Sequence, residues 1–372
     1  MLYNDCIWID RYETKFDTAG GVNLPKITEC YGTNGKKYKQ LFKGNDDLRQ
    51  DAVMEQVFEL VNSVLQRDRE TRRRELSVRG YKVVPLSTQA GLLEFVGNTS
   101  PLREWLNRAH QSYRPQDTKQ NEILSQMKAA QATKQAERQL ETFLKIRENF
   151  KPVMRHYFTE KHRNPVTWFA MRLKYTRSVA TTSIVGHILG LGDRHTSNIL
   201  MDNSTGEVVH IDLGIAFEQV KGKLLPVPER VPFRMTADMV DGMGTSGTQG
   251  VFQRCAEETL RVLRDGSEVI MTVLEVFKHD PLHSWTASEL KVKHAQRDVP
   301  TMTAYDTSRF NLGIGIDMSS GTAQESADRA LSSVARKLDK GLSVESTVNE
   351  LIAEATDPLN LATIFYGWCP HL

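Results

Sequence analysis

The chain has 372 residues, of which 40% are hydrophobic and 25% are charged, a composition typical of a folded protein. Its 48 basic and 46 acidic side chains give a net charge of +2 at pH 7, so charge offers no reason to expect binding to nucleic acid or to a membrane. The four cysteines lack Cys-x-x-Cys spacing and no apolar run approaches the ~20 residues of a membrane span, so we expect no zinc motif and no transmembrane helix in a chain of a reducing compartment.

Two adjacent glycines, Gly20 and Gly21, follow a strand-like run at residues 7–9 and a polar bend. Glycine has no Cβ, so the backbone N–H groups of such a pair can approach an anion closely. The pair also precedes a strand that carries a lysine, which is the position that a phosphate-covering loop requires. An ordinary turn is the alternative, because two glycines alone are weak evidence.

A β-hairpin is predicted at residues 27–31 and 37–43, because these runs flank an Asn-Gly pair, the strongest short hairpin signal. In the second strand, alternation places Leu41 and Lys43 on the same face. Leu41 could then lie beneath an adenine ring while Lys43 reaches a phosphate. A solvated charge at the sheet edge is the alternative for Lys43.

A helix is predicted after this hairpin, with residues 45–47 as its N-cap and acidic first turn and with apolar periodicity through about Leu65. Asp51 lies on the first two turns and could reach back to Lys43 as an ion pair. The alternative for Asp51 is a surface acid that complements the helix dipole.

Residues 81–86 and 91–97 predict two further strands, and the second runs into a connection that ends at a glycine. Phe95, in this connection, is interpreted as a core residue rather than a ligand contact. The connection then leads into the helical part of the chain.

Two helical stretches follow. Residues 107–149 are polar with sparse apolar positions, so we expect exposed helix without chemistry. Asn164 and Pro165 supply a cap and a first-turn proline for a buried helix that runs to Leu189 and ends at Gly190.

The most informative stretch is a second hairpin, in which apolar runs at residues 199–201 and 208–211 flank five turn-forming residues. If it is centred on Thr205, Asn198 directly faces Asp212 across the open end. Directly opposed residues have Cβ atoms roughly 4.5–5.5 Å apart. An amide oxygen and a carboxylate at that separation can share a hard cation such as Mg²⁺ that holds substrate phosphates.

The loop ahead of this hairpin carries Asp193, Arg194 and His195. It offers a proton acceptor in Asp193, a second proton handler in His195 and a metal ligand in Asn198. These are the components of phosphoryl transfer: a base for the attacking hydroxyl and ligands for a metal that neutralises charge. The alternative is an ordinary surface hairpin with a local Asp193–Arg194 ion pair.

Two motifs connect this chemistry to a known family. Residues 192–198 (Gly-Asp-Arg-His-Thr-Ser-Asn) and 212–214 (Asp-Leu-Gly) resemble the catalytic and metal-binding loops of the phosphatidylinositol 3-kinase superfamily. Residues 342–372 resemble the FATC tail of its protein-kinase members. Other runs resemble the ataxia-telangiectasia-mutated (Tel) branch of these kinases: residues 176–183, 217–219, 231–235 and 241–244.

The resemblance implies an α+β, two-lobed kinase fold. A small antiparallel-sheet N-lobe with one main helix would precede a larger, mostly helical C-lobe and a C-terminal helical FATC tail. Within the C-lobe, the catalytic loop would be residues 190–198 and the activation segment residues 212–235. The implied boundaries are 1–96 for the N-lobe, 97–290 for the C-lobe, 291–341 for a regulatory connector and 342–372 for the FATC tail.

The resemblance also implies roles for individual residues. Asp193 and His195 would act on the attacking hydroxyl and the γ-phosphate, and which of them is the base stays open. Asn198 and Asp212 would hold Mg²⁺ or Mn²⁺. A hinge at residues 94–96 would bind the adenine edge. The full set of implied ATP-binding residues is Gly20, Gly21, Leu41, Lys43, Asp51, Tyr81, Glu94, Phe95, Val96, Leu200 and Ile211.

The implied function is that of an ATP-dependent serine/threonine protein kinase that prefers a glutamine after the target residue. It would act in the nucleus, in DNA double-strand-break signalling and telomere maintenance. Its partners would be Ser/Thr-Gln protein substrates, a second copy of a longer helical-repeat protein, and a DNA-break sensor complex. We expect no direct binding of this region to membrane or nucleic acid.

Two alternatives are a phosphoinositide lipid kinase of the same superfamily and a pseudokinase scaffold. A lipid kinase would need clustered cations in the activation segment, whereas Lys221, Lys223, Arg230 and Arg234 are dispersed. A scaffold would not need the lysine, acids and amide that phosphoryl transfer requires, and all of them are present.

Overall fold

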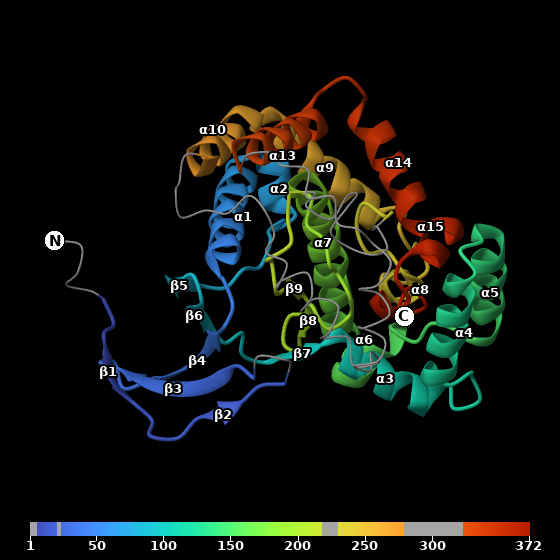
Figure 1. Ribbon diagram of the computed structural model, residues 1–372, viewed down its shortest axis with the longest axis horizontal. Helices are drawn as coiled ribbons and strands as arrows, with labels where there is room; N and C mark the ends of the chain where they lie inside the picture. The colour runs from blue at the N-terminus through green and yellow to red at the C-terminus, as the bar shows by residue number, and fades with distance from the viewer. Residues whose placement is uncertain (1–5, 21–23, 218–229, 279–322) are drawn as a thin grey trace.

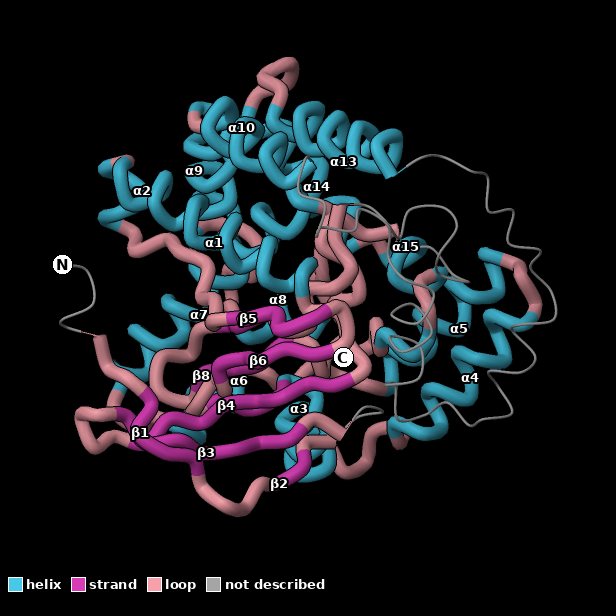
Figure 2. The backbone as a smooth tube through the Cα atoms, turned by 60° about the vertical axis from the view of Figure 1, so that its left-hand side comes forward, coloured by secondary structure: helices cyan, strands magenta, loops and turns pink. Residues whose placement is uncertain are grey.

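The computed structural model describes residues 6–20, 24–217, 230–278 and 323–372, and its elements form two regions (Figure 1). An antiparallel sheet of N-terminal strands lies beside helix α1, and α7 lies in the middle of the helical region, packed against α6, α8, α9 and α13 (Figures 1 and 2). This confirms the predicted two-lobed α+β fold. Gly21, residues 218–229 of the predicted activation segment and residues 279–322 lie outside the described residues.

The N-terminal sheet has the strand order β1-β3-β4-β6-β5, with β2 paired to β3, and its described pairs are antiparallel. The predicted Asn-Gly hairpin is confirmed, because Gly35 takes a left-handed conformation with φ of 73° between β3 and β4. The strands are β1 (Ile9–Tyr12), β2 (Asp17–Thr18), β3 (Lys26–Gly32), β4 (Lys37–Gly44), β5 (Val83–Ser87) and β6 (Ala90–Glu94).

Helix α1 (Arg49–Arg67) is the main helix of this region and begins later than predicted. Leu48 stands at the N-cap position and makes no side-chain cap, but Asp47 Oδ1, within the predicted cap segment 45–47, accepts the N–H of Arg49 at 3.2 Å. Asp46 and Asp47 also form ion pairs with Lys43 and Arg49. A short helix, α2 (Arg69–Arg73), follows.

A second sheet connects the two regions. Strand β7 (Thr99–Pro101) follows the first sheet along the chain and pairs with β8 (Ile199–Asp202), which pairs with β9 (Val208–His210). The connection that leaves the N-terminal sheet therefore runs directly onto the predicted catalytic hairpin.

Helix α7 (Pro165–Leu189) is the buried centre of the helical region and confirms its prediction. The side chain of Asn164 accepts the N–H groups of Val166 and Thr167, and Gly190 ends the helix with φ of 63°, a conformation that glycine adopts without Cβ strain. The chain therefore leaves α7 at a defined angle into the predicted catalytic loop.

The stretch at residues 107–149 is not simply exposed helix. Helices α4 (Gln120–Ala132) and α5 (Ala136–Asn149) bury apolar side chains, and the Gln131 amide bonds the Ile364 carbonyl and the Tyr366 N–H. These helices lie beside the C-terminal tail (Figure 1). The prediction failed because their apolar positions are few but are covered by a segment distant in sequence.

The C-terminal helices pack onto the same core. Helix α13 (Ala323–Leu338), in the segment predicted as a regulatory connector, buries an apolar face made of Ala327, Ala330, Leu331, Val334 and Leu338. The last residues are also buried, with Cys369 at 0% and Leu372 at 1% exposure. The remaining described helices are α3 (Leu102–Tyr113), α6 (Arg155–Lys161), α8 (Ala237–Gly242), α9 (Val251–Asp265), α10 (Ser267–Lys278), α13 (Ala323–Leu338), α14 (Val344–Thr356), α15 (Pro358–Thr363) and the 3₁₀ helix η1 (Tyr366–Trp368).

Candidate active site

Strands β8 and β9 form the predicted hairpin, but in a register shifted by one residue from the predicted one. Leu200 pairs with Val209, so Asn198 stands opposite Ile211, whose N–H donates to the Asn198 carbonyl at 3.0 Å. The prediction that Asn198 directly faces Asp212 is therefore wrong.

The turn explains the shift. Asp202 Oδ1 accepts the N–H groups of Ser204 at 2.7 Å and Thr205 at 3.0 Å, and Gly206 has φ of 78°. A hydrogen bond from the Asp202 N–H to the Glu207 carbonyl at 2.9 Å closes the loop formed by residues 203–206, which has an even number of residues. A turn centred on Thr205 would require an odd number.

Arg194 holds the two strand ends together. Its side chain is buried, and its guanidinium donates to the carbonyl oxygens of Gly192 at 2.8 Å, Ile211 at 2.8 Å and Asp212. The backbone bond between Ile211 and Asn198 and the Arg194 guanidinium therefore together hold the neighbouring segments that carry Asn198 and Asp212.

Asp193 and His195 flank Arg194. Asp193 has φ of 57°, which is strained for a residue with a Cβ, and its carbonyl accepts the Asn198 side-chain N–H at 3.0 Å. His195 Nδ1 accepts the Ser197 N–H at 3.2 Å, which places the ring proton on Nε2. Burial, reinforced by the charge of Arg194, lowers the pKa of His195 to about 3, so its imidazole is neutral at pH 7.

Lys43, on β4, is surrounded by carboxylates. Its Nζ lies 3.5 Å from Asp46 Oδ2. Burial disfavours the charged ammonium, but the fields of Asp212, Asp46 and Asp51 outweigh burial and hold the pKa of Lys43 above its usual value. Lys43 of the sheet and Asp212 after the hairpin thus lie close enough for their charges to interact. Asp46 was not predicted as a partner, although its i+3 spacing from Lys43 is visible in the sequence.

Asp51 joins the two regions. It is 1% exposed, and its Oδ1 accepts the N–H of Leu213 at 2.9 Å. Leu213 follows Asp212, which is itself strained with φ of 57°. Helix α1 therefore anchors the turn that carries the second predicted metal ligand, and Asp51 also acts on Lys43 through its charge.

Glu55 lies one helical turn after Asp51 and was not predicted. Its Oε2 accepts the N–H of Tyr81 at 3.1 Å. Burial raises the pKa of Glu55 to about 8, and the Asp51 charge adds to that rise. Its carboxyl is therefore mostly protonated at pH 7.

Five of the predicted ATP-binding residues gather in a small apolar cluster that is separate from the main core. The cluster contains side chains from the N-terminal sheet and from the β8–β9 hairpin, so it lies between the two regions. Its members are buried Leu48, Tyr81, Leu93 and Val209, with Leu41, Val83, Val96, Leu200 and Ile211 packed against them.

The predicted hinge at residues 94–96 lies at the edge of this cluster. The Phe95 N–H donates to the Lys39 carbonyl at 3.2 Å, and the Lys39 ammonium lies 5.7 Å from the Phe95 ring centroid. Phe95 is half-buried and belongs to neither apolar cluster of the described residues, so its interpretation as a core residue is wrong. Glu94 is exposed, and Val96 packs on the small cluster.

Gly20 lies in the connection between β2 and β3, as a loop covering phosphates would. A Cβ built at Gly20 would meet no atom within 4 Å, so the described structure leaves open space there.

Comparison with known families shows which family has this sequence. Residues 37–287 match the family described as phosphatidylinositol 3- and 4-kinase, and residues 341–372 match the FATC domain. The chain belongs to the phosphatidylinositol 3- and 4-kinase family. The lysine, the catalytic loop and the Asp-Leu-Gly turn all fall inside the matched range.

Within this family, the chain is 51% identical to the serine/threonine-protein kinase tel1 of Aspergillus oryzae, over 99% of this chain and 12% of that protein. It is 46% identical to the serine-protein kinase ATM of Sus scrofa, over 98% of this chain and 12% of that protein. A solved structure described as the FAT and kinase domain of CtTel1 has a TM-score of 0.88 at 46% identity, covering 100% of this chain and 24% of that one. The chain thus spans 12% of the length of these two curated relatives.

The donor set fits the divalent ion used by this kinase family. Mg²⁺ is usually held by one or two protein ligands together with waters and substrate phosphates, and Asn198 and Asp212 provide two. No group of three or more His, Cys, Asp or Glu side chains suited to a metal occurs among the described residues. No helix in that part of the chain is long and apolar enough to cross a membrane.

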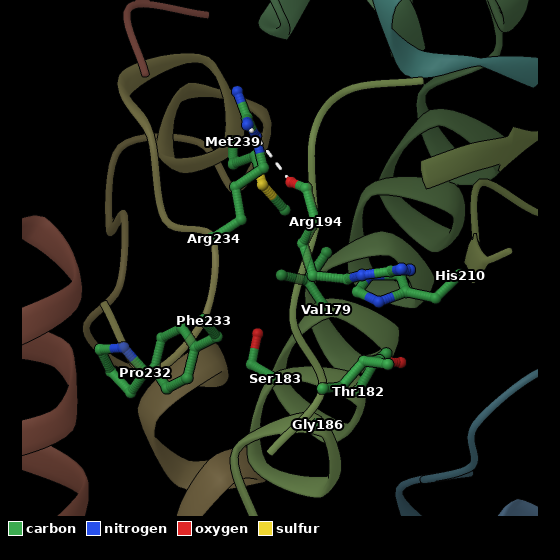
Figure 3. A pocket seen from close by; sticks show the side chains of 11 residues that line it. Val179, Thr182, Ser183, Gly186, Arg194, His210, Pro232, Phe233, Arg234 and Met239 are labelled. Carbon is green, nitrogen blue, oxygen red and sulfur yellow. Dashed lines mark hydrogen bonds between the residues drawn. The ribbon is translucent and has the colours of Figure 1, made fainter. Parts of the chain in front are cut away.

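A small cavity of about 20 Å³ lies behind the catalytic loop (Figure 3). It is lined by Arg194 and His210 on one side and by Pro232, Phe233 and Arg234 on the other, and by none of the predicted ATP-binding residues. A cavity of this size holds a water molecule rather than a nucleotide, so it is not the substrate site.

Proposed function

We propose that this chain transfers the γ-phosphate of ATP to serine or threonine side chains of proteins. The observation that carries the proposal is the assembly of Lys43, Asp51 and Asp212 across the two regions. Asp51 Oδ1 of α1 accepts the Leu213 N–H at 2.9 Å, and the charges of Asp212, Asp46 and Asp51 together stabilise the Lys43 ammonium. Phosphoryl transfer needs a phosphate-binding cation and metal ligands at one point.

The nucleotide would lie against the apolar cluster. Leu41, Tyr81, Val96, Leu200 and Ile211 contribute to it from both regions, as expected of a cleft that binds an adenine ring. The ring would be bound at the hinge, and the triphosphate would extend toward Lys43. When bound through Asn198 and Asp212, Mg²⁺ would neutralise charge on the phosphates.

Asp193 is the better candidate for the base. His195 has a pKa of about 3 and its Nδ1 already accepts the Ser197 N–H, so its ring is a weak proton acceptor at pH 7. The Nε2–H group of His195 can instead donate a hydrogen bond to the phosphoryl oxygens. Asp193 would then accept the proton of the attacking hydroxyl.

We propose a preference for Ser/Thr-Gln sites, and action in the nucleus in DNA double-strand-break signalling and telomere maintenance. The names of the relatives, serine/threonine-protein kinase tel1 and serine-protein kinase ATM, support a protein substrate. A related structure described as a complete CtTel1 dimer with C2 symmetry supports a homodimer. A DNA-break sensor complex is the proposed activating partner.

A lipid kinase is disfavoured by Arg234. Its side chain is 2% exposed and donates to carbonyl oxygens of the C-terminal tail, so it cannot bind an inositol phosphate. Arg230 is exposed, and Lys221 and Lys223 lie outside the described residues.

The test is a phosphate-transfer assay with radiolabelled ATP and Mg²⁺ on three substrates: a Ser-Gln peptide, the same peptide with the glutamine changed to asparagine, and phosphatidylinositol vesicles. We expect transfer mainly to the Ser-Gln peptide. Transfer mainly to the vesicles would identify a lipid kinase, and no transfer by folded, ATP-binding protein would identify a scaffold.

A further inference from the structure

We propose that Arg234 is a positioning residue through which the C-terminal tail sets the geometry of the catalytic loop. The inference rests on the proposed kinase function and concerns how its site is held in place. Arg234 contacts neither nucleotide nor substrate in this assignment. It acts on the reacting groups through the backbone of Arg194.

The contacts of Arg234 connect three parts of the chain. Its Nη1 donates to the carbonyl of Arg194 at 3.3 Å and to that of Trp368 at 2.8 Å. Its Nη2 donates to the carbonyls of Cys369 at 2.8 Å and Leu372 at 2.7 Å. Figure 3 shows the bond between Arg234 and Arg194, which crosses from the end of the predicted activation segment to the catalytic loop.

The hydrogen bond from Arg234 to the Arg194 carbonyl connects Arg234 to the predicted catalytic loop. Arg194 stands between Asp193 and His195, and its own side chain holds the Ile211 and Asp212 carbonyls. A shift of the Arg194 backbone would therefore move the proposed base, the neutral histidine and the metal-binding turn together. Arg234 and Arg194 thus connect the C-terminal tail to the proposed base, the neutral histidine and the metal-binding turn.

The tail completes the environment of a buried cation. Arg234 is 2% exposed, and the Trp368 ring lies 4.2 Å from its guanidinium carbon. Burial of a guanidinium is costly unless hydrogen bonds compensate it, and here the compensation comes from the four carbonyl acceptors of Nη1 and Nη2, three of which belong to the tail. Nε is buried without a hydrogen-bond partner, so these four bonds are the ones that hold the cation. If the tail moved away, Arg234 would have to leave its position, and its bond to Arg194 would be lost with it.

Arg264 provides a matched control. It is also a buried arginine, at 5% exposure, and it also binds the C-terminal segment, through the Leu342 carbonyl at 2.8 Å and the Thr347 hydroxyl at 3.2 Å. These two hydrogen bonds lie at the start of that segment, and neither of them involves the catalytic loop. Arg264→Lys therefore perturbs tail attachment without touching Arg194.

The experiment compares Arg234→Lys and Arg264→Lys in the full-length protein, with kcat and the KM for ATP measured on a Ser-Gln peptide. A lysine ammonium has one nitrogen with three N–H groups, so it cannot reach all four carbonyl oxygens that the two terminal guanidinium nitrogens serve. Because a misplacement of about 1 Å can cost about 10²-fold in rate, we expect kcat of Arg234→Lys to fall roughly ten- to a hundredfold, with KM for ATP changed less than about threefold. Arg264→Lys should keep kcat within about threefold of the parent protein.

The outcomes separate the two proposals. An unsubstituted protein that transfers no phosphate overturns the proposed function and this inference with it. An active parent with kcat unchanged in Arg234→Lys, or lowered equally in both variants, overturns this inference alone. If Arg234→Lys does not fold, Trp368→Leu replaces it as the test, because this change removes the ring beside the guanidinium but keeps the Trp368 carbonyl. A roughly three- to tenfold loss of kcat at unchanged ATP affinity would support the inference. An unchanged kcat would overturn it.

Discussion

The nucleotide side and the catalytic side of the site are held together differently. The nucleotide side is a small cluster of apolar side chains, such as Leu41, Tyr81 and Leu200, between the N-terminal sheet and the β8–β9 hairpin. The catalytic side is held by two buried arginines, Arg194 and Arg234, that donate to backbone carbonyls. Apolar contacts weaken gradually as atoms are removed, whereas a buried charge that loses its partners becomes strongly unfavourable.

Because the two sides are held differently, we expect substitutions in them to have different effects on ATP affinity and on rate. Changes in the apolar cluster should mainly alter affinity for ATP, since the proposed adenine site lies against that cluster. Changes in the arginine network should mainly alter the rate, because the network holds the groups proposed to react. Four substitutions test this division, beginning with the largest expected effect.

Asp193→Asn removes the proposed base while keeping the size of the side chain. Because a general base contributes about 10²- to 10⁴-fold, kcat should fall by that factor while the KM for ATP stays nearly constant. Steady-state kinetics on a Ser-Gln peptide measure both. Asp265→Asn, at a half-exposed surface acid of α9, is the control, with an unchanged kcat. Full turnover by Asp193→Asn would refute the assignment.

Arg194→Met removes the guanidinium that holds the catalytic side together. It leaves the carbonyls of Gly192, Ile211 and Asp212 without their charged donor, so the free energy of unfolding should fall by about 1.5–3 kcal/mol and kcat should fall as well. Urea denaturation measures the first effect. Lys145→Met, which removes an exposed ion pair with Glu141, should change the free energy of unfolding little and leave kcat unchanged. Equal unfolding midpoints for the two variants would contradict this prediction.

Glu55→Gln tests helix α1, which contacts both sides of the site: Glu55 accepts the N–H of Tyr81 in the apolar cluster, and Asp51 accepts the N–H of Leu213 beside Asp212. Because the folded protein raises the pKa of Glu55 to about 8 from 4.5, the folded state holds a proton between pH 4.5 and 8 that the unfolded state releases. Stability should therefore decline through that window, by at most about 1.4 kcal/mol per pH unit from this group.

The Gln variant should lose this decline and be more stable than the parent at pH 8, with little difference at pH 4.5. Urea denaturation at the two pH values measures the change. Parallel pH dependences for parent and variant would show that Glu55 ionises normally.

Leu41→Ala tests the nucleotide side and should have the smallest effect. Removal of a partly buried side chain from the cluster should weaken ATP binding by roughly tenfold, about 1.4 kcal/mol, with kcat changed little. Leu86→Ala, at a 62% exposed position of the same sheet, is the control. A larger loss of kcat than of affinity would show that the two sides are not separable.

Local patterns were sufficient for much of the fold. The Asn-Gly turn, the Asn164 cap with Pro165, and Gly190 at the end of α7 are confirmed, because each depends on residues adjacent in sequence. Leu41 and Lys43 were also correctly placed near the other predicted residues, since alternation within one strand determines the face of each side chain.

The hairpin register could not be obtained in this way. It depends on Asp202, whose side chain caps the turn and also binds Arg79, far away in sequence. Hydrophobic periodicity is compatible with a turn centre on either side of Thr205, and only these polar contacts distinguish the two.

The sequence alone determined where the residues proposed to carry the chemistry stand along the chain: the lysine strand, the Asp-Arg-His loop and the Asp-Leu-Gly turn. Only the tertiary structure decided how they are held. Asp51 bonds Leu213, Arg194 holds the Asp212 carbonyl, and Arg234 joins the tail to the loop. The physical reason is that backbone carbonyls occur at every residue, so the sequence cannot show which of them a buried arginine will bind until the chain has folded.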